Sequence, residues 1–179
     1  LPARCRTRDR PVRALYRGYG VKAFGYSVAA VVFVLDQLSK YWVTYVLDLR
    51  TLGSVQLLPV FNLTWVENTG VSTGLFRAET DKMRWLLVAA TLAIALAVAV
   101  WIAREKNRWD VFALGLVLGG ALGNIVDRAR YGYVVDFFHA YWRDHHFYVF
   151  NVADAAISCG VLVLLARALW ARDAQPVKE

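Results

Sequence analysis

The sequence lacks the residues and motifs on which several large enzyme classes depend. It has only two cysteines, Cys5 in a basic stretch and Cys159 in an apolar one, so no disulfide framework is expected. Its three histidines lack the spacing of a zinc site, and no HExxH, GxSxG or Walker motif is present. These absences argue against a zinc protease, an elbow-type serine hydrolase and a nucleotide hydrolase. We expect neither a metal nor another cofactor.

Apolar residues are what the sequence has in excess. They make up 58% of its 179 residues, above the roughly 45–50% of soluble domains, and the mean hydropathy is +0.38. The polar groups of a soluble domain could not cover that much apolar surface, and a disordered chain contains far fewer apolar residues. The composition predicts a small polytopic membrane protein with its charged residues in tails and loops.

Four segments meet the requirement of about 20 mostly apolar residues for a membrane-spanning helix. They lie at about 23–47, 84–104, 109–128 and 147–170. The third segment contains several glycines, which are unfavourable in a soluble helix but allow helices to approach closely in lipid. The predicted fold class is an all-α membrane protein with four transmembrane helices.

The segment between the first two helices has a different composition. Residues 55–65 are rich in β-branched, aromatic and leucine side chains, and the turn-forming residues 68–70 (NTG) follow. We expect one or two short strands and a turn at about 51–76, forming a small extracytoplasmic β-sheet between helices one and two. Residues 23–170 then form a single membrane-embedded domain between a basic tail at 1–22 and a short tail at 171–179.

Lysines and arginines are unequally distributed about these helices. Most of the 21 such residues lie in the two tails and in the loop between the second and third helices. By the positive-inside rule, both termini are predicted to be cytoplasmic, and the segments 48–84 and 129–146 to face outward. We interpret the net charge of +7 as a topology signal with contact to anionic membrane lipids, and we expect no nucleic acid partner.

Carboxylates at membrane depth are costly, about +2.5 to 3.5 kcal/mol on insertion scales, and are candidates for function by default. The sequence has four: Asp36, Asp127, Asp136 and Asp154. Lys40 follows Asp36 by four residues, so both lie on one helix face, and we interpret them as an ion pair that braces the structure. Asp127 is expected to pair either with Arg128 or with another helix.

Asp136 and Asp154 have no basic residue beside them, and an antiparallel crossing of the third and fourth helices would bring them to similar depth. Two neighbouring carboxyls without a cation share a proton, so that one serves as general base on water and the other as general acid. The spacing equally allows four carboxylates that are separately satisfied. Three amides near the same boundary could donate to a carboxylate or a substrate carbonyl, although each alone is more often a cap or turn residue: Asn68, Asn124 and Asn151.

A small transporter or channel is the main alternative to an enzyme. It would use Asp36, Lys40 and Asp127 as an ion relay near the bilayer midplane. In contrast, Asp136 and Asp154 are predicted to gather at one face of the membrane.

Five motifs in order along the chain resemble the lipoprotein signal peptidases (signal peptidase II), which are four-helix aspartic proteases of the bacterial inner membrane. The matching stretches are residues 36–40 (DQLSK), 61–70 (FNLTWVENTG), 119–128 (GGALGNIVDR), 132–137 (GYVVDF) and 150–157 (FNVADAAI). The resemblance covers about residues 25–170 and leaves out the basic tail.

The resemblance implies a catalytic dyad of Asp136 and Asp154. It implies that Asn68, Asn124, Arg128 and Asn151 hold the substrate backbone and orient the dyad, that Asp127 lies outside the dyad and orders Arg128, and that Asp36, Lys40 and Gly70 are structural. The implied substrate is a prolipoprotein that carries diacylglycerol on its lipobox cysteine and is cleaved just before that cysteine. The resemblance also implies a monomer in the inner membrane, an active site near the outer interface and inhibition by globomycin.

The chain departs from the family pattern at one place. Residues 71–76 read VSTGLF, so Thr73 stands where the family commonly has Phe. In the family this loop is thought to help bind the substrate, so we expect a different affinity for the lipid of the substrate or for the inhibitor. The assignment of the catalytic residues is not affected.

Overall fold

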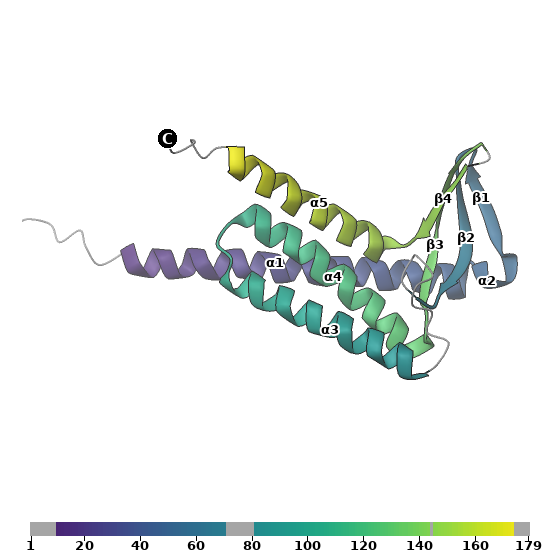
Figure 1. Ribbon diagram of the computed structural model, residues 1–179, viewed down its shortest axis with the longest axis horizontal. Helices are drawn as coiled ribbons and strands as arrows, with labels where there is room; N and C mark the ends of the chain where they lie inside the picture. Colours follow the sequence, from purple (N-terminus) through teal and green to yellow (C-terminus); the bar gives the residue numbers. More distant parts are fainter. Residues whose placement is uncertain (1–9, 71–80, 144, 174–179) are drawn as a thin grey trace, which may run out of the picture.

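The computed structural model describes residues 10–70, 81–143 and 145–173. Four long helices pack together, and a small sheet stands at one end of the bundle (Figure 1). The helices are α1 (Arg10–Tyr41), α3 (Asp81–Arg104), α4 (Arg108–Tyr131) and α5 (Val152–Asp173). Each contains a stretch that is long and apolar enough to cross a membrane. The predicted fold class is therefore confirmed.

The helix ends differ from the predicted ones mainly at α1 and α5. The helix α1 begins at Arg10, inside the expected tail, and continues through a π-helical turn (η1, Trp42–Val46). The fourth helix was predicted to start near residue 147, which is wrong, because α5 begins at Val152. The preceding aromatic residues pair with a neighbouring strand instead, and Asn151 caps the helix.

The central helix of the bundle is α4, which contacts the other three long helices. Its glycines lie where those neighbours approach. A Cβ added at Gly119 would lie 2.5 Å from the carbonyl oxygen of Ala29 in α1, and one at Gly120 would lie 2.5 Å from that of Ala153 in α5. Only glycine permits backbones to come this close, so the predicted packing role of these residues is confirmed.

The sheet is larger than predicted. It has four antiparallel strands in the order β1 (Ser54–Leu58), β2 (Phe61–Asn68), β3 (Val134–Trp142) and β4 (His145–Phe150). Only β1 and β2 come from the expected region at 51–76, of which residues 71–76 lie outside the described residues. The strands β3 and β4 come from the segment between α4 and α5, which was expected to be a loop and the start of a helix.

An apolar cluster joins the sheet to the end of the helix bundle. It contains Val43 of η1, Leu49 of the one-turn helix α2 (Leu49–Leu52), Leu63 of β2, and Val135 and Phe137 of β3. All five side chains are buried. Because neighbouring residues of a strand point to opposite faces, Val135 and Phe137 on one face direct Asp136 to the other. The packing of β3 therefore sets the direction of a candidate catalytic carboxyl.

Candidate active site

Asp136 lies on β3 with its carboxyl almost completely buried, at 1% exposure. One oxygen, Oδ2, accepts a hydrogen bond from Asn68 Nδ2 at 3.0 Å. The other, Oδ1, accepts one from Asn151 Nδ2 at 2.6 Å. Asn68 reaches the carboxyl because β2 pairs with β3, with Val66 opposite Asp136. Two neutral amide donors thus hold this carboxyl, and neither adds a charge.

Asp154 lies in the first turn of α5 and is half-buried. Its backbone amide donates to Asn151 Oδ1 at 2.9 Å, and its Oδ2 accepts from the backbone amide of Asn151 at 3.3 Å. This reciprocal pair is a capping box, in which the cap residue and the third helical residue satisfy each other. The other oxygen, Oδ1, accepts from Asn124 Nδ2 at 2.9 Å. The start of the helix therefore fixes the Asp154 carboxyl.

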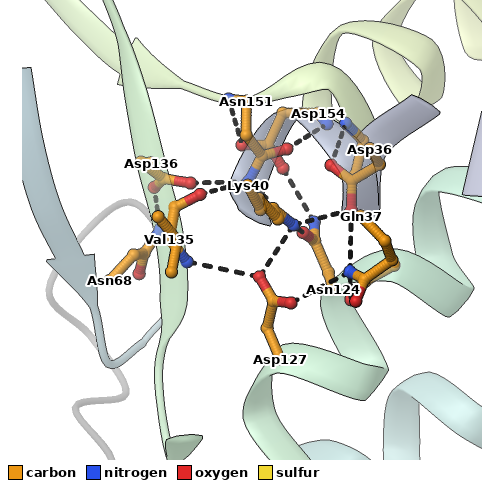
Figure 2. A network of polar contacts seen from close by, with 12 residues as sticks. Asp36, Gln37, Lys40, Asn68, Asn124, Asp127, Val135, Asp136, Asn151 and Asp154 are labelled. Carbon is orange, nitrogen blue, oxygen red and sulfur yellow. Dashed lines mark hydrogen bonds and ion pairs between the residues drawn. The ribbon is translucent and has the colours of Figure 1, made fainter. Parts of the chain in front are cut away.

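Asn151 connects the two carboxyls, as Figure 2 shows. Its side chain is fully buried; the amide nitrogen binds Asp136 and the amide oxygen caps the helix that carries Asp154. The same nitrogen lies 3.3 Å from Asn124 Oδ1. The structure thus brings together side chains from β2, β3, α4, α5 and the residue that caps α5: Asp136, Asp154, Asn68, Asn124 and Asn151.

Burial raises the pKa of the Asp136 carboxyl from 3.8 to about 7, and the nearby negative charge of Asp154 adds to this effect. The hydrogen bonds from Asn68 and Asn151 oppose it. A carboxyl with this pKa is partly protonated at neutral pH, so it can donate a proton. Two adjacent carboxyls, one of them protonated, can supply one acid and one base.

A buried lysine, Lys40, lies next to this cluster of carboxyls and amides. Lys40 Nζ is 2.8 Å from Asp36 Oδ2 and 2.8 Å from Asp127 Oδ2, and it donates to Asn124 Oδ1 at 3.2 Å. The expected ion pair of Asp36 and Lys40 is therefore present. The question left open for Asp127 is also answered, because this residue pairs with a lysine on another helix. The other oxygen of Asp36 accepts from the backbone amide of Ala153 at 3.0 Å, which ties α1 to the start of α5.

Asp127 has two further partners, and one of them was missed by sequence reasoning. Gln37 Nε2 donates to Asp127 Oδ1 at 3.0 Å and to Asp36 Oδ2 at 3.2 Å. The backbone amide of Val135 donates to Asp127 Oδ2 at 3.3 Å, so Asp127 connects α4 to the strand of Asp136. A long amide side chain next to a carboxylate within an apolar span was the signal that could have identified Gln37.

Arg128 extends the site toward β2. Its Nη2 donates to the carbonyl oxygen of Gly70 at 3.3 Å, and the amide of Gly70 donates to Asn68 Oδ1 at 3.1 Å. Within the described residues, the Nε of Arg128 is buried without a hydrogen-bond partner. A buried donor without a partner is costly, so this nitrogen is suited to a ligand that supplies an acceptor. Thr73 lies outside the described residues.

Asp154 also borders a groove of about 520 Å³. The groove is lined by residues of β4 and α5: Tyr148, Phe150, Asp154, Ala155, Ile157, Ser158 and Cys159. Apolar side chains make up most of this lining, so an apolar ligand could lie against the carboxyl. In the part of the chain that the structure describes, no three His, Cys, Asp or Glu residues are grouped so that they could hold a metal ion.

Four apolar helices with a buried cluster of carboxyls and amides at one end define a membrane-integral enzyme. Two solved structures, both described as bacterial membrane enzymes, have this fold. The first is 26% identical in sequence, with a TM-score of 0.75. The alignment covers 87% of this chain and 93% of the solved chain. The second is 28% identical in sequence, with a TM-score of 0.69. The alignment covers 81% of this chain and 92% of the solved chain.

Sequence comparison identifies the family. Residues 28–170 match the family described as signal peptidase (SPase) II. A lipoprotein signal peptidase of Sphingopyxis alaskensis is 55% identical over 147 residues, which are 82% of this chain and 85% of the relative. A lipoprotein signal peptidase of Rhizorhabdus wittichii is 53% identical over 153 residues, which are 85% of this chain and 89% of the relative. This chain belongs to the signal peptidase II family of membrane peptidases, as its motifs indicated.

Proposed function

We propose that this chain is an intramembrane aspartic endopeptidase that removes the signal peptide from diacylglyceryl-modified prolipoproteins. It cleaves just before the lipid-modified lipobox cysteine. Family membership supports the substrate class. The observation that carries the aspartic mechanism is the single side chain of Asn151, which joins Asp136 and Asp154 in one hydrogen-bonded cluster.

In the proposed reaction, Asp136 holds the shared proton because it is the more deeply buried carboxyl. The Asp154 carboxylate takes a proton from a water molecule, whose oxygen attacks the scissile carbonyl carbon. Asp136 gives its proton to the carbonyl oxygen, which yields a neutral tetrahedral diol. When the C–N bond breaks, Asp154 returns a proton to the departing nitrogen and a diol hydroxyl returns one to Asp136. The products are a peptide carboxyl group and a free amine on the lipid-modified cysteine.

The neighbouring polar groups have supporting roles in this reaction. The unpartnered Nε of Arg128 binds a carbonyl of the substrate backbone. Asn68 and Asn151 orient Asp136, and Asn124 orients Asp154. The ion pairs of Lys40 with Asp36 and Asp127 hold these groups in place.

The geometry supports lateral entry of the substrate from lipid. The apolar groove beside Asp154 is lined by β4 and the first turns of α5, so acyl chains can remain in the bilayer while the peptide bond reaches the carboxyls. The helix ends nearest both termini lie opposite the sheet (Figure 1). With basic residues concentrated in the tails, we place both termini in the cytoplasm and the site near the outer interface of a bacterial inner membrane. We expect the enzyme to act as a monomer.

The ion-relay alternative has no comparable support. Asp36, Lys40 and Asp127 are each at most 5% exposed, and Lys40 pairs with both carboxylates, so the three charges form one buried ion cluster beside a groove between α1 and α4. The comparisons with peptidases point the same way.

Cleavage of a purified substrate tests the proposal. The protein in lipid nanodiscs is mixed with a diacylglyceryl-modified prolipoprotein, with and without globomycin, and the mobility shift of the product is followed on a gel. Asp136→Asn and Asp154→Asn should each abolish cleavage without preventing membrane insertion. Asp48→Asn is the matched control, since Asp48 is exposed and has the left-handed conformation (φ 49°) that asparagine also accepts.

Full activity of either dyad variant would contradict the aspartic mechanism. Absence of cleavage by the wild-type protein would contradict the proposed substrate.

A further inference from the structure

An arginine at the start of α3 reaches across to the end of α4. Arg84 Nε donates to the carbonyl oxygen of Arg128 at 2.8 Å, and Arg84 Nη2 donates to that of Ala129 at 2.6 Å. The arginine side chain is only 22% exposed, and its guanidinium lies 5.2 Å from the ring centroid of Trp85. Arg84 therefore binds the backbone of α4 with two donors in a restrained side-chain position.

The two carbonyls that Arg84 binds belong to the last turn of α4, where the helix has no further amide groups of its own to satisfy them. Gly132 closes the helix in the left-handed conformation (φ 85°), and its amide donates to the carbonyl of Arg128 at 3.1 Å. Arg84 adds two more donors and a positive charge at the negative end of the helix dipole. Loss of Arg84 removes one donor from each of these carbonyls, and within the described residues only that of Arg128 keeps the amide of Gly132 as a partner.

This turn connects two groups of the candidate site. Arg128 precedes Gly132 by four residues, and its side chain points to the carbonyl oxygen of Gly70. Asp136 follows Gly132 by four residues on β3. A rotation of the turn would displace the Arg128 guanidinium and the Asp136 carboxyl together, because both are attached to it through a short, ordered length of chain.

We infer that Arg84 is a positioning residue for peptide-bond cleavage: it locks the turn between α4 and β3 and thereby sets the relative position of Arg128 and Asp136. This inference rests on the proposed function. Arg84 binds the backbone carbonyls of the turn, and we expect it to act through that turn. The positive charge and the two-donor fork both contribute: a lysine ammonium keeps the charge but not the fixed pair of hydrogen bonds, and a shorter, neutral glutamine amide keeps neither the charge nor the reach.

Arg84→Gln and Arg84→Lys are compared with Arg104→Gln, which makes the same change of charge at the exposed last residue of the same helix. The variants are purified in nanodiscs, and their rates are normalised to the monodisperse, folded fraction. Initial rates of prolipoprotein cleavage give kcat and KM separately. Hydrogen exchange measured by mass spectrometry on peptides that cover residues 128–136 reports on the turn without any need for activity.

We expect Arg84→Gln to lower kcat by about tenfold or more, since a displacement of about 1 Å in a catalytic group can cost a hundredfold. KM should change much less, exchange in residues 128–136 should become faster, and Arg84→Lys should recover part of the lost kcat. Arg104→Gln should match the wild type in all three measurements.

The inference is overturned if folded Arg84→Gln has the wild-type kcat, or if its loss of activity only follows the loss of folded protein. Unchanged exchange in residues 128–136 also overturns it. An inactive wild type would refute the proposed function instead, and the exchange measurement would still decide whether Arg84 holds the turn.

Discussion

The side-chain nitrogen of Asn151 lies 2.6 Å from Oδ1 of Asp136. The oxygen of the same amide accepts the backbone amide of Asp154 and so caps α5. One residue thus couples a strand carboxyl to a helix carboxyl, and the placement of the pair depends on a helix cap.

Asn151→Ala should damage activity more than stability. Loss of a helix cap costs about 1 kcal/mol, which lowers Tm by a few degrees. Loss of the bond to Asp136 should lower kcat by at least about tenfold because the carboxyls lose their relative position. The matched control is Asn107→Ala, since Asn107 caps α4 at the other end of the bundle, where its Oδ1 accepts from Trp109. Equal kcat losses in the two variants would show that Asn151 acts only as a cap.

Activity should fall as the pH rises above about 7. The raised pKa of Asp136, caused first by burial and then by the charge of Asp154, means that this group loses its proton near that pH. A general acid without its proton cannot protonate the scissile carbonyl. The measurement is kcat as a function of pH in nanodiscs. A rate that stays level up to about pH 9 would exclude Asp136 as the acid.

Stability should depend on pH through the same carboxyl. Between about pH 4 and 7, the folded protein keeps a proton on Asp136 that the unfolded chain has lost, so the free energy of unfolding decreases as the pH rises and then levels off. Asp136→Asn removes this dependence. In thermal unfolding at several pH values, the Tm of the wild type should therefore fall relative to that of the variant as the pH rises across this range. A constant difference would contradict the raised pKa.

Lys40→Met should destabilise the protein strongly. Lys40 is the cation that pairs with both Asp36 and Asp127, which are 0% and 1% exposed, so its removal leaves these buried carboxyls without their cation. Breaking such a cluster typically costs about 3–5 kcal/mol. Asp36→Asn added to Lys40→Met should restore part of the loss, and Lys82→Met at an exposed site is the control. The measurements are Tm and the yield of folded protein. A single variant as stable as the control would contradict a bracing role for the cluster.

Alkylation of Cys159 should slow cleavage. This exposed thiol lines the groove that Asp154 borders, so a bulky maleimide would occupy the path proposed for the substrate. Cys159→Ser should keep its activity and become insensitive to the reagent, which separates this site from Cys5. Cleavage rates before and after treatment provide the test. Full activity of the alkylated wild type would place the substrate elsewhere.

The sequence by itself was sufficient for the parts of the fold that depend on local pattern. Long apolar runs identified the spans, because a helix satisfies its own backbone and needs only length and composition to cross a membrane. The four-residue spacing of Asp36 and Lys40 predicted their ion pair, which is present. Glycines in the third span predicted close helix packing, and Gly119 and Gly120 provide it.

The tertiary structure decided what depends on contacts between distant residues. A short aromatic run such as residues 145–150 can be the start of a helix or a strand, and only its pairing with β3 makes it β4. The sequence left two possible partners for Asp127, and the packing of α1 against α4 places Lys40 beside it. The pKa of Asp136 likewise depends on burial by segments that lie far away in the sequence. Composition and spacing are properties of neighbours along the chain, whereas strand pairing, ion-pair choice and desolvation are set by residues that meet only in the fold.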